Sequence, residues 1–123
     1  MAADKPGDLK YLTSFVKPDI SVVTAIGDLP VHVEAFSGPK AVAEEKSHIV
    51  KVLEANGVAI LNYDDKIVLD MKNKTKGHVF TFGFEKGSTI RALEEKSVFC
   101  IPEDDDDFCG VSFKVESDNR VVP

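Results

Sequence analysis

The chain has 123 residues, of which 43% are hydrophobic and 29% charged, and its formal net charge is -6 at pH 7. This length predicts one domain, and the composition is that of a folded globular protein rather than a disordered one. The net negative charge argues against a nucleic-acid partner, because phosphate backbones are bound by clustered Lys and Arg. No apolar run reaches the roughly 20 residues of a membrane helix, and the N-terminal MAADKPGD lacks the apolar core of a signal peptide. We therefore predict a cytoplasmic protein without a membrane partner.

The first expected elements are a helix and a strand. A helix is predicted between Asp4 and Lys17, because Asp is a preferred N-cap and Pro18 stops the helical pattern. Its apolar stripe consists of Leu9, Leu12, Phe15 and Val16. The run from Ile20 to Ile26 is short, β-branched and almost continuously apolar, which predicts a strand covered on both faces in a parallel sheet.

A second helix is predicted from Pro39 to Ala55, and its apolar stripe contains a lysine. The apolar members of the stripe are Val42, Ile49, Val50 and Leu53. Lys46 lies inside it, so either its methylenes cover apolar surface while the ammonium reaches water, or it points into a site at the sheet edge, where open α/β sheets bind ligands. His32 lies in the loop before this helix and could converge on the same place, although a single loop histidine is also a common surface residue.

Two more strands follow, with a helix between them. Residues 58–61 form a short apolar run, a helix is predicted to continue to about Lys74, and His78 to Phe82 is a third strand that ends at Gly83. The order β-α-β-α-β implies right-handed parallel crossovers, so three strand ends share one rim.

The loop Asn62-Tyr63-Asp64-Asp65 belongs to that rim. The simplest interpretation is that Asp64 or Asp65 is the N-cap of the following helix, because Asp is a preferred cap. The functional alternative is that Asn62 or Asp65 faces a nucleotide at the same sheet edge.

The pattern changes from Ser88 onward. Strands joined by turns, typical of antiparallel pairing, are predicted at residues 89–93, 97–101 and 111–116. The acidic run at residues 103–107 lacks the ligand spacing and the glycine of an EF-hand loop, so we interpret it as a solvated loop rather than a metal site. Cys100 and Cys109 are expected to be free thiols in a reducing cytosol.

Six short segments resemble, in order and spacing, the central ATPase domain of the Mur ligases. They are MAADKPGDLKYL, KPDISVVTAIG, VHVEAF, AVAEEKSHIV, GVAILNYDD and VFTFGF, with TIRA after the last. The resemblance is strongest to the branch of the family that adds D-alanyl-D-alanine to UDP-N-acetylmuramoyl-tripeptide in peptidoglycan synthesis. It implies an α/β fold with a parallel three-layer sheet core, P-loop-like but truncated, and an antiparallel β region at the C-terminal end. Residues 1–91 would be part of the central domain and 92–123 its β-rich continuation.

The resemblance also implies a metal site and a reaction. In the family, the histidine at the position of His32 binds magnesium, and the lysine at the position of Lys46 is carbamylated. The added carboxylate gives the metal an oxygen ligand, which magnesium prefers, and makes Lys46 the expected catalytic residue. The implied cofactors are ATP and Mg²⁺, and the implied reaction is ADP-forming amide synthesis between a UDP-N-acetylmuramoyl-peptide and D-alanyl-D-alanine.

The sequence differs from the family's pattern at several positions, and some family motifs are expected outside it. Ala2 stands where a glycine is usual, and Ala25 where an asparagine is common before the Ile-Gly step. The family's phosphate loop and a metal-binding glutamate are expected upstream of Met1, and its adenine-contacting segment is expected after Pro123. We therefore expect an internal piece of a longer ligase, inactive alone, whose missing N- and C-terminal parts are its partners.

Two other readings of the function are open. One is a different member of the same superfamily, similar to folylpolyglutamate synthase, and the other is a non-catalytic α/β binding module. The phrase PVHVEAF, followed by a Ser-Gly-Pro start to the helix, favours the Mur branch.

Overall fold

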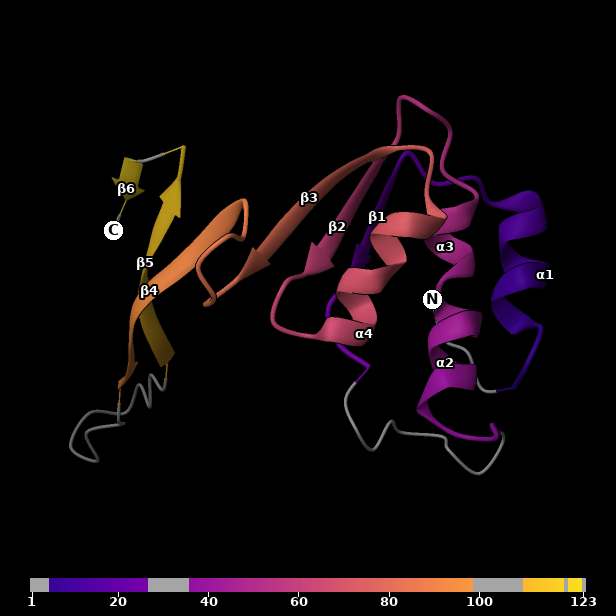
Figure 1. Cartoon of the computed structure of the whole chain (residues 1–123), viewed down its shortest axis with the longest axis horizontal. Helices are drawn as coiled ribbons and strands as arrows, with labels where there is room; N and C mark the ends of the chain where they lie inside the picture. The colour runs from indigo at the N-terminus through magenta and orange to yellow at the C-terminus, as the bar shows by residue number, and fades with distance from the viewer. Residues whose placement is uncertain (1–4, 27–35, 99–109, 119, 123) are drawn as a thin grey trace, which may run out of the picture.

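Six strands form one mixed sheet in the order β1-β2-β3-β4-β5-β6 in the computed structural model, which describes residues 5–26, 36–98, 110–118 and 120–122 (Figure 1). The elements in chain order are α1 (Asp8–Phe15), β1 (Ile20–Val23), α2 (Pro39–Lys46), α3 (His48–Lys51), β2 (Val58–Asn62), α4 (Lys66–Leu69), the 3-10 helix η2 (Asp70–Lys74), β3 (His78–Gly83), β4 (Ile90–Val98), β5 (Gly110–Ser117) and β6 (Arg120–Val122). The α/β fold class expected from the sequence is confirmed.

Strands β1, β2 and β3 are parallel, as the β-α-β-α-β pattern predicts. Val22 lies opposite Ile60 in the register of β1 with β2, and Ile60 lies opposite Phe80 in that of β2 with β3. The carboxyl ends of these three strands therefore meet at one rim of the sheet, which is where the candidate site residues were expected.

The C-terminal half of the sheet is antiparallel, with one difference from the prediction. β4 pairs parallel with β3 and antiparallel with β5, and β5 pairs antiparallel with β6. The two strands expected at 89–93 and 97–101 are one strand over their described part, because an irregularity between Leu93 and Lys96 bends β4 without ending it. Glu94 takes a positive φ of 54° there.

Three expectations about the C-terminal half are not tested by this fold. The expected division near residue 91 falls within β4, and the extent of the two parts stays a prediction. The acidic run at 103–107, Cys100 and Cys109 lie outside the described residues.

The predicted helices form, with different boundaries. Asp4 lies outside the described residues, and α1 begins at Asp8 with Gly7 as its N-cap, whose φ of 97° suits a glycine. The expected helix from Pro39 to Ala55 consists of α2 and α3, with Ser47 between them.

The helices pack on one face of the parallel strands, where they form the core (Figure 1). Alternate strand residues point toward them: Ala59 and Leu61 of β2 are fully buried against Val50 of α3 and Val68 of α4. The buried cluster comprises Val23, Ile26, Phe36, Val42, Ala43, Val50, Leu53, Ala59, Leu61, Val68 and Met71. The stripe predicted on the central helix is therefore the one that packs on the sheet.

The opposite face of the sheet has no helix among the described residues. Its apolar side chains, aligned by the strand registers, are Ile20, Val22, Val58, Ile60, Phe80, Phe82, Ile90, Ala92, Val111, Phe113, Val115 and Val122. The expectation that β1 is covered on both faces is wrong for the described chain, because Ile20 and Val22 are 61% and 51% exposed. We call this surface the helix-free face. An apolar pocket of about 410 Å³ lies on it, around Phe82 and Phe113.

Candidate functional site

Lys46 is the last residue of α2 and lines a pocket beside β1. The pocket has a volume of about 360 Å³ and runs along the edge of that strand where the described part of the chain places no neighbouring strand. Its lining consists of Leu9, Pro18, Ile20, Ser21, Val22, Val23, Thr24, Ala25, Lys46 and Ile49. Lys46 is half-buried and, among the described residues, is the one charged residue of this lining. The side chain expected to cover apolar surface or to enter a site at the sheet edge thus lies at a pocket that reaches the carboxyl end of β1.

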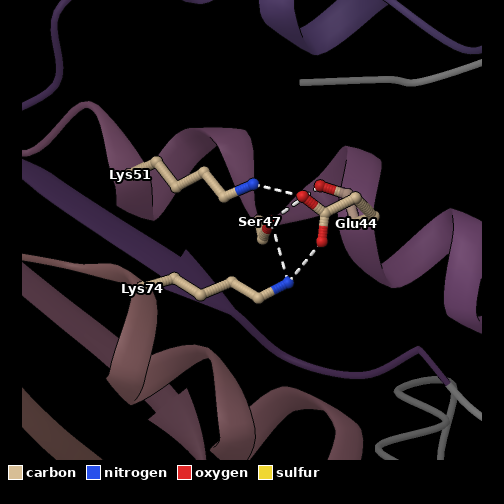
Figure 2. Close-up of polar contacts among 4 residues, drawn as sticks. All are labelled: Glu44, Ser47, Lys51 and Lys74. Carbon is tan, nitrogen blue, oxygen red and sulfur yellow. Dashed lines mark hydrogen bonds and ion pairs between the residues drawn. The ribbon is translucent and has the colours of Figure 1, made fainter.

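The two residues before Lys46 have partners, whereas Lys46 has none among the described residues. Glu44 forms ion pairs with Lys51 and with Lys74, whose Nζ lies 2.6 Å from Oε2 (Figure 2). These two ammonium groups, which donate hydrogen bonds to the carboxylate, lower the pKa of Glu44 to about 2. Lys51 and Lys74 reach Glu44 from α3 and η2, so the cluster ties three helices together on the protein surface.

Glu45 is a buried carboxylate that caps another helix. It is 6% exposed, and its two oxygens accept hydrogen bonds from the backbone N–H groups of Gly7 at 2.9 Å and Leu9 at 2.7 Å. The first N–H groups of a helix have no partner within the helix, and a carboxylate there is favoured by the helix dipole. Glu45 therefore joins α2 to the start of α1. Sequence reasoning missed this role, although Glu45 follows Val42 by three residues and precedes Ile49 by four, on the buried side of the helix.

Asn62 and Asp65 both contact the residues that follow β1. Asn62 Nδ2 donates a hydrogen bond to the carbonyl oxygen of Thr24 at 2.8 Å, and Asp65 Oδ2 accepts one from the backbone N–H of Ile26 at 2.9 Å. Asp65 Oδ1 also accepts from the N–H groups of Ile67 and Val68, so the expected N-cap is confirmed for Asp65. Their predicted role toward a nucleotide stays a prediction.

Asp64 holds the turn after β3. Its carboxylate accepts hydrogen bonds from the backbone N–H groups of Phe84 at 2.7 Å and Glu85 at 3.0 Å. Gly83 permits this approach, because a Cβ there would lie 2.5 Å from Asp64 Oδ1. The Asn62–Asp65 loop thus ties together the carboxyl ends of β1, β2 and β3, which the sequence did not reveal beyond the shared rim.

The expected metal site is only partly within the described residues. His32 lies outside them, so its distance from Lys46 stays a prediction. Among the described residues there is no group of three or more His, Cys, Asp and Glu that could hold a metal ion. The described helices also include none that is long and apolar enough to span a membrane.

The sequence matches a known protein family over most of its length. Residues 1–114 match the Mur ligase middle domain. The UDP-N-acetylmuramoyl-tripeptide–D-alanyl-D-alanine ligase of Mycobacterium leprae is 33% identical over 79 residues, which are 64% of this chain and 15% of that protein. The ligase of the same name from Buchnera aphidicola subsp. Baizongia pistaciae is 32% identical over 93 residues, 75% of this chain and 20% of that protein.

Solved structures of MurF share the fold. MurF from Thermotoga maritima in complex with ADP superposes with a TM-score of 0.74 at 22% identity, over 99% of this chain and 26% of that one. MurF from Acinetobacter baumannii gives a TM-score of 0.74 at 20% identity, over 98% of this chain and 24% of that one. The chain spans about a quarter or less of the length of these relatives. Because the match to the middle domain covers residues 1–114, the chain belongs to the Mur ligase family.

Proposed function

We propose that this chain is part of an ATP-dependent, ADP-forming ligase that adds D-alanyl-D-alanine to UDP-N-acetylmuramoyl-tripeptide. The observation that carries the proposal is Lys46, half-buried at a pocket near the carboxyl end of β1 and without a partner among the described residues. The relatives that are 32–33% identical to the chain are ligases of that name, which favours this branch over a folylpolyglutamate synthase.

The reaction requires activation of a carboxylate. An amine cannot displace oxide from a carboxylate, so the γ-phosphoryl group of ATP is first transferred to the carboxylate oxygen, giving an acyl phosphate and ADP. The amine of D-alanyl-D-alanine then attacks the acyl carbon, loses a proton, and expels phosphate as the amide bond forms. Magnesium, when bound, neutralises negative charge on the transferred and leaving groups.

Lys46 fits a role as a carbamylated metal ligand. The neutral amine of lysine adds to carbon dioxide and releases a proton, so the ammonium is replaced by a carbamate anion with two oxygens. Magnesium prefers oxygen ligands, whereas an ammonium would repel it. Since the other described residues of the pocket lining are uncharged, a carbamate on Lys46 would meet no competing cation among them. His32, at the family's metal-binding position, is the second proposed ligand.

We also propose that the chain works inside a longer polypeptide. Parallel strands normally have both faces covered, and here the helix-free face exposes Ile20, Val22 and Phe80. Among the described residues, β1 has a neighbouring strand on one side only. Both features support a partner supplied by the remaining N- and C-terminal parts of a ligase, which in the relatives amount to about three quarters of the length or more.

A segment exchange tests the proposal. Residues 1–114 replace the matching segment of the Mycobacterium leprae ligase, and ADP release is measured with UDP-N-acetylmuramoyl-tripeptide and D-alanyl-D-alanine. We expect ADP release that requires both substrates, and a loss of roughly a hundredfold or more in kcat/KM for Lys46→Arg, because a lost metal ligand costs at least as much as a lost supporting group. Lys51→Arg, which keeps the charge that pairs with Glu44, is the control.

Two results would contradict the proposal. The first is a folded exchanged enzyme that releases no ADP in response to the two substrates, or that does so undiminished with Lys46→Arg. The second is ADP release that requires a folate and glutamate instead, which would place the chain with the folylpolyglutamate synthases.

A further inference from the structure

The three residues after β1, Thr24 to Ile26, lie at or next to one end of the pocket that Lys46 lines. They lie beyond the pairing of β1 with β2. The pairing of β1 with β2 ends at Val23 opposite Leu61. Thr24 and Ala25 line the pocket beyond that point, and Ile26 is the next residue. As the outermost strand of the described sheet, β1 has no second neighbour to fix them. This end of the pocket needs support from elsewhere.

Two side chains from the loop after β2 provide that support. Asn62 Nδ2 binds the Thr24 carbonyl at 2.8 Å, and Asp65 Oδ2 binds the Ile26 N–H at 2.9 Å, so the two bonds bracket Ala25. Within the described part of the chain, residues 24–26 make no other backbone hydrogen bond. Each of these side chains is itself held by a second bond. Asn62 Oδ1 accepts from the N–H of Asp64, and Asp65 Oδ1 caps α4.

We infer that Asn62 and Asp65 are positioning residues. They hold residues Thr24–Ile26, which we call the end wall of the pocket, in place beside Lys46. The inference rests on the proposed function of Lys46, and it gives the two residues a role that needs no contact with a nucleotide. Because these two side chains act through the end wall, substituting them should change the surroundings of the Lys46 ammonium while the chain stays folded.

The chemistry of the two bonds suggests selective variants. In Asp65→Asn the amide oxygen can still cap α4, since Asn and Asp are comparable caps, but the amide nitrogen would face the Ile26 N–H as a second donor. In Asn62→Asp one oxygen can still accept from Asp64, whereas the other would face the Thr24 carbonyl as a second acceptor. The double variant has the same net charge as the wild type, which separates the lost bonds from a change of charge.

Asp64→Asn is the matched control. It also removes one carboxylate from the same loop, and one of its two bonds to Phe84 and Glu85 is lost in the same way. Those bonds hold the turn after β3, which contributes no residue to the lining of the Lys46 pocket. Asn62→Ala, which removes a donor without adding charge, is the milder variant if Asn62→Asp does not fold.

The measurement is competitive acetylation of the whole chain, followed by peptide mass spectrometry, which reports the reactivity of each lysine separately. We expect Asp65→Asn, Asn62→Asp and the double variant to change the rate at Lys46 relative to exposed Lys10 by at least about twofold, because each variant removes a hydrogen bond that holds the residues beside Lys46. Lys51 and Lys74, which pair with Glu44, should keep their rates.

Each outcome decides the inference. A change at Lys46 that Asp64→Asn does not produce supports positioning. An acetylation rate at Lys46 that is unchanged in both Asp65→Asn and Asn62→Asp overturns the inference. An equal change of rate in all variants and at all lysines also overturns it, because that result indicates a general loosening of the fold. The segment exchange tests the proposed function separately. If that function is wrong, the exchanged enzyme shows no substrate-dependent ADP release.

Discussion

Three consecutive residues at the end of α2 have three different surroundings. Glu44 is exposed and held by two lysines, Glu45 is buried and caps α1, and Lys46 lines the pocket beside β1. Successive helical residues point about 100° apart, so three neighbours face the surface, the α1 contact and the pocket. Neither of the two preceding glutamates therefore forms an ion pair with Lys46.

Glu44→Gln tests the ion-pair cluster and its pH dependence. The pKa of Glu44 is lowered to about 2, so its stabilising contribution is fully present above its unfolded pKa and is lost as the pH falls toward 2. Because the pair is exposed, we expect the free energy of unfolding at pH 7 to fall by less than about 1 kcal/mol. Urea unfolding of both proteins should show this difference shrinking between about pH 5 and pH 2.

The control for this prediction is Glu54→Gln, at an exposed position with no side-chain hydrogen bond or ion pair among the described residues. A Glu44→Gln difference that stays constant over the same pH range, or that grows as the pH falls, would show that the cluster does not lower the pKa of Glu44.

At the scale of elements, charged and polar side chains connect the helices and strand ends. Glu45 joins α2 to α1, and the loop from Asn62 to Asp65 joins the ends of the parallel strands. Buried polar groups of this kind need their partners, because an unmatched donor or acceptor loses its hydration without compensation.

Glu45→Ala should destabilise the chain more than any change at Glu44. It leaves the N–H groups of Gly7 and Leu9 without their acceptor, and we expect a loss of about 1–3 kcal/mol in the free energy of unfolding. Glu45→Gln, which keeps one acceptor oxygen, should lose less. Chemical denaturation measures both, and a Glu45→Ala variant as stable as Glu44→Ala would refute the capping role.

Gly83→Ala should act through Asp64. The added Cβ would lie 2.5 Å from Asp64 Oδ1, so the carboxylate must leave the N–H groups of Phe84 and Glu85. We expect a loss of about 1–2 kcal/mol. In a double-mutant cycle with Asp64→Ala, the combined loss should be close to the larger single loss, because both changes remove the same bonds. Additive losses would contradict this explanation.

The sequence predicted these elements better than their connections. Alternating and helical apolar patterns are local, so the order of strands and helices, the buried stripe around Lys46 and the Asp65 cap could all be inferred. The bonds from Glu45 to α1 and from Asn62 to Thr24 join residues 36 to 38 positions apart, and a single sequence does not show which distant segments meet. The single strand β4 was missed because a bulge interrupts its pattern.

For the whole molecule, the dominant feature is the helix-free face. The described helices all pack on the other side of β1–β3, while β4–β6 extend beyond them (Figure 1). β1 reads Ile-Ser-Val-Val and contains none of the charged residues or prolines that keep an edge strand from pairing. Exposed apolar area and an open edge together favour association.

The chain alone should therefore self-associate. Val22→Lys on β1 and Phe80→Lys on β3 place charges on the helix-free face and should shift the protein toward monomer in sedimentation velocity. Phe15→Lys, at an even more exposed residue of α1, should leave the association unchanged. A monomeric wild-type chain with a cooperative thermal transition would contradict the prediction.

We propose that Lys46 belongs to the metal site of a Mur ligase. The most direct measurement is ¹³C NMR of the segment-exchanged ligase in ¹³C-bicarbonate with and without Mg²⁺. We expect a carbamate signal that Mg²⁺ strengthens and that disappears in Lys46→Arg but persists in Lys51→Arg. A folded enzyme that shows no carbamate signal, or one that Lys46→Arg leaves intact, would contradict it.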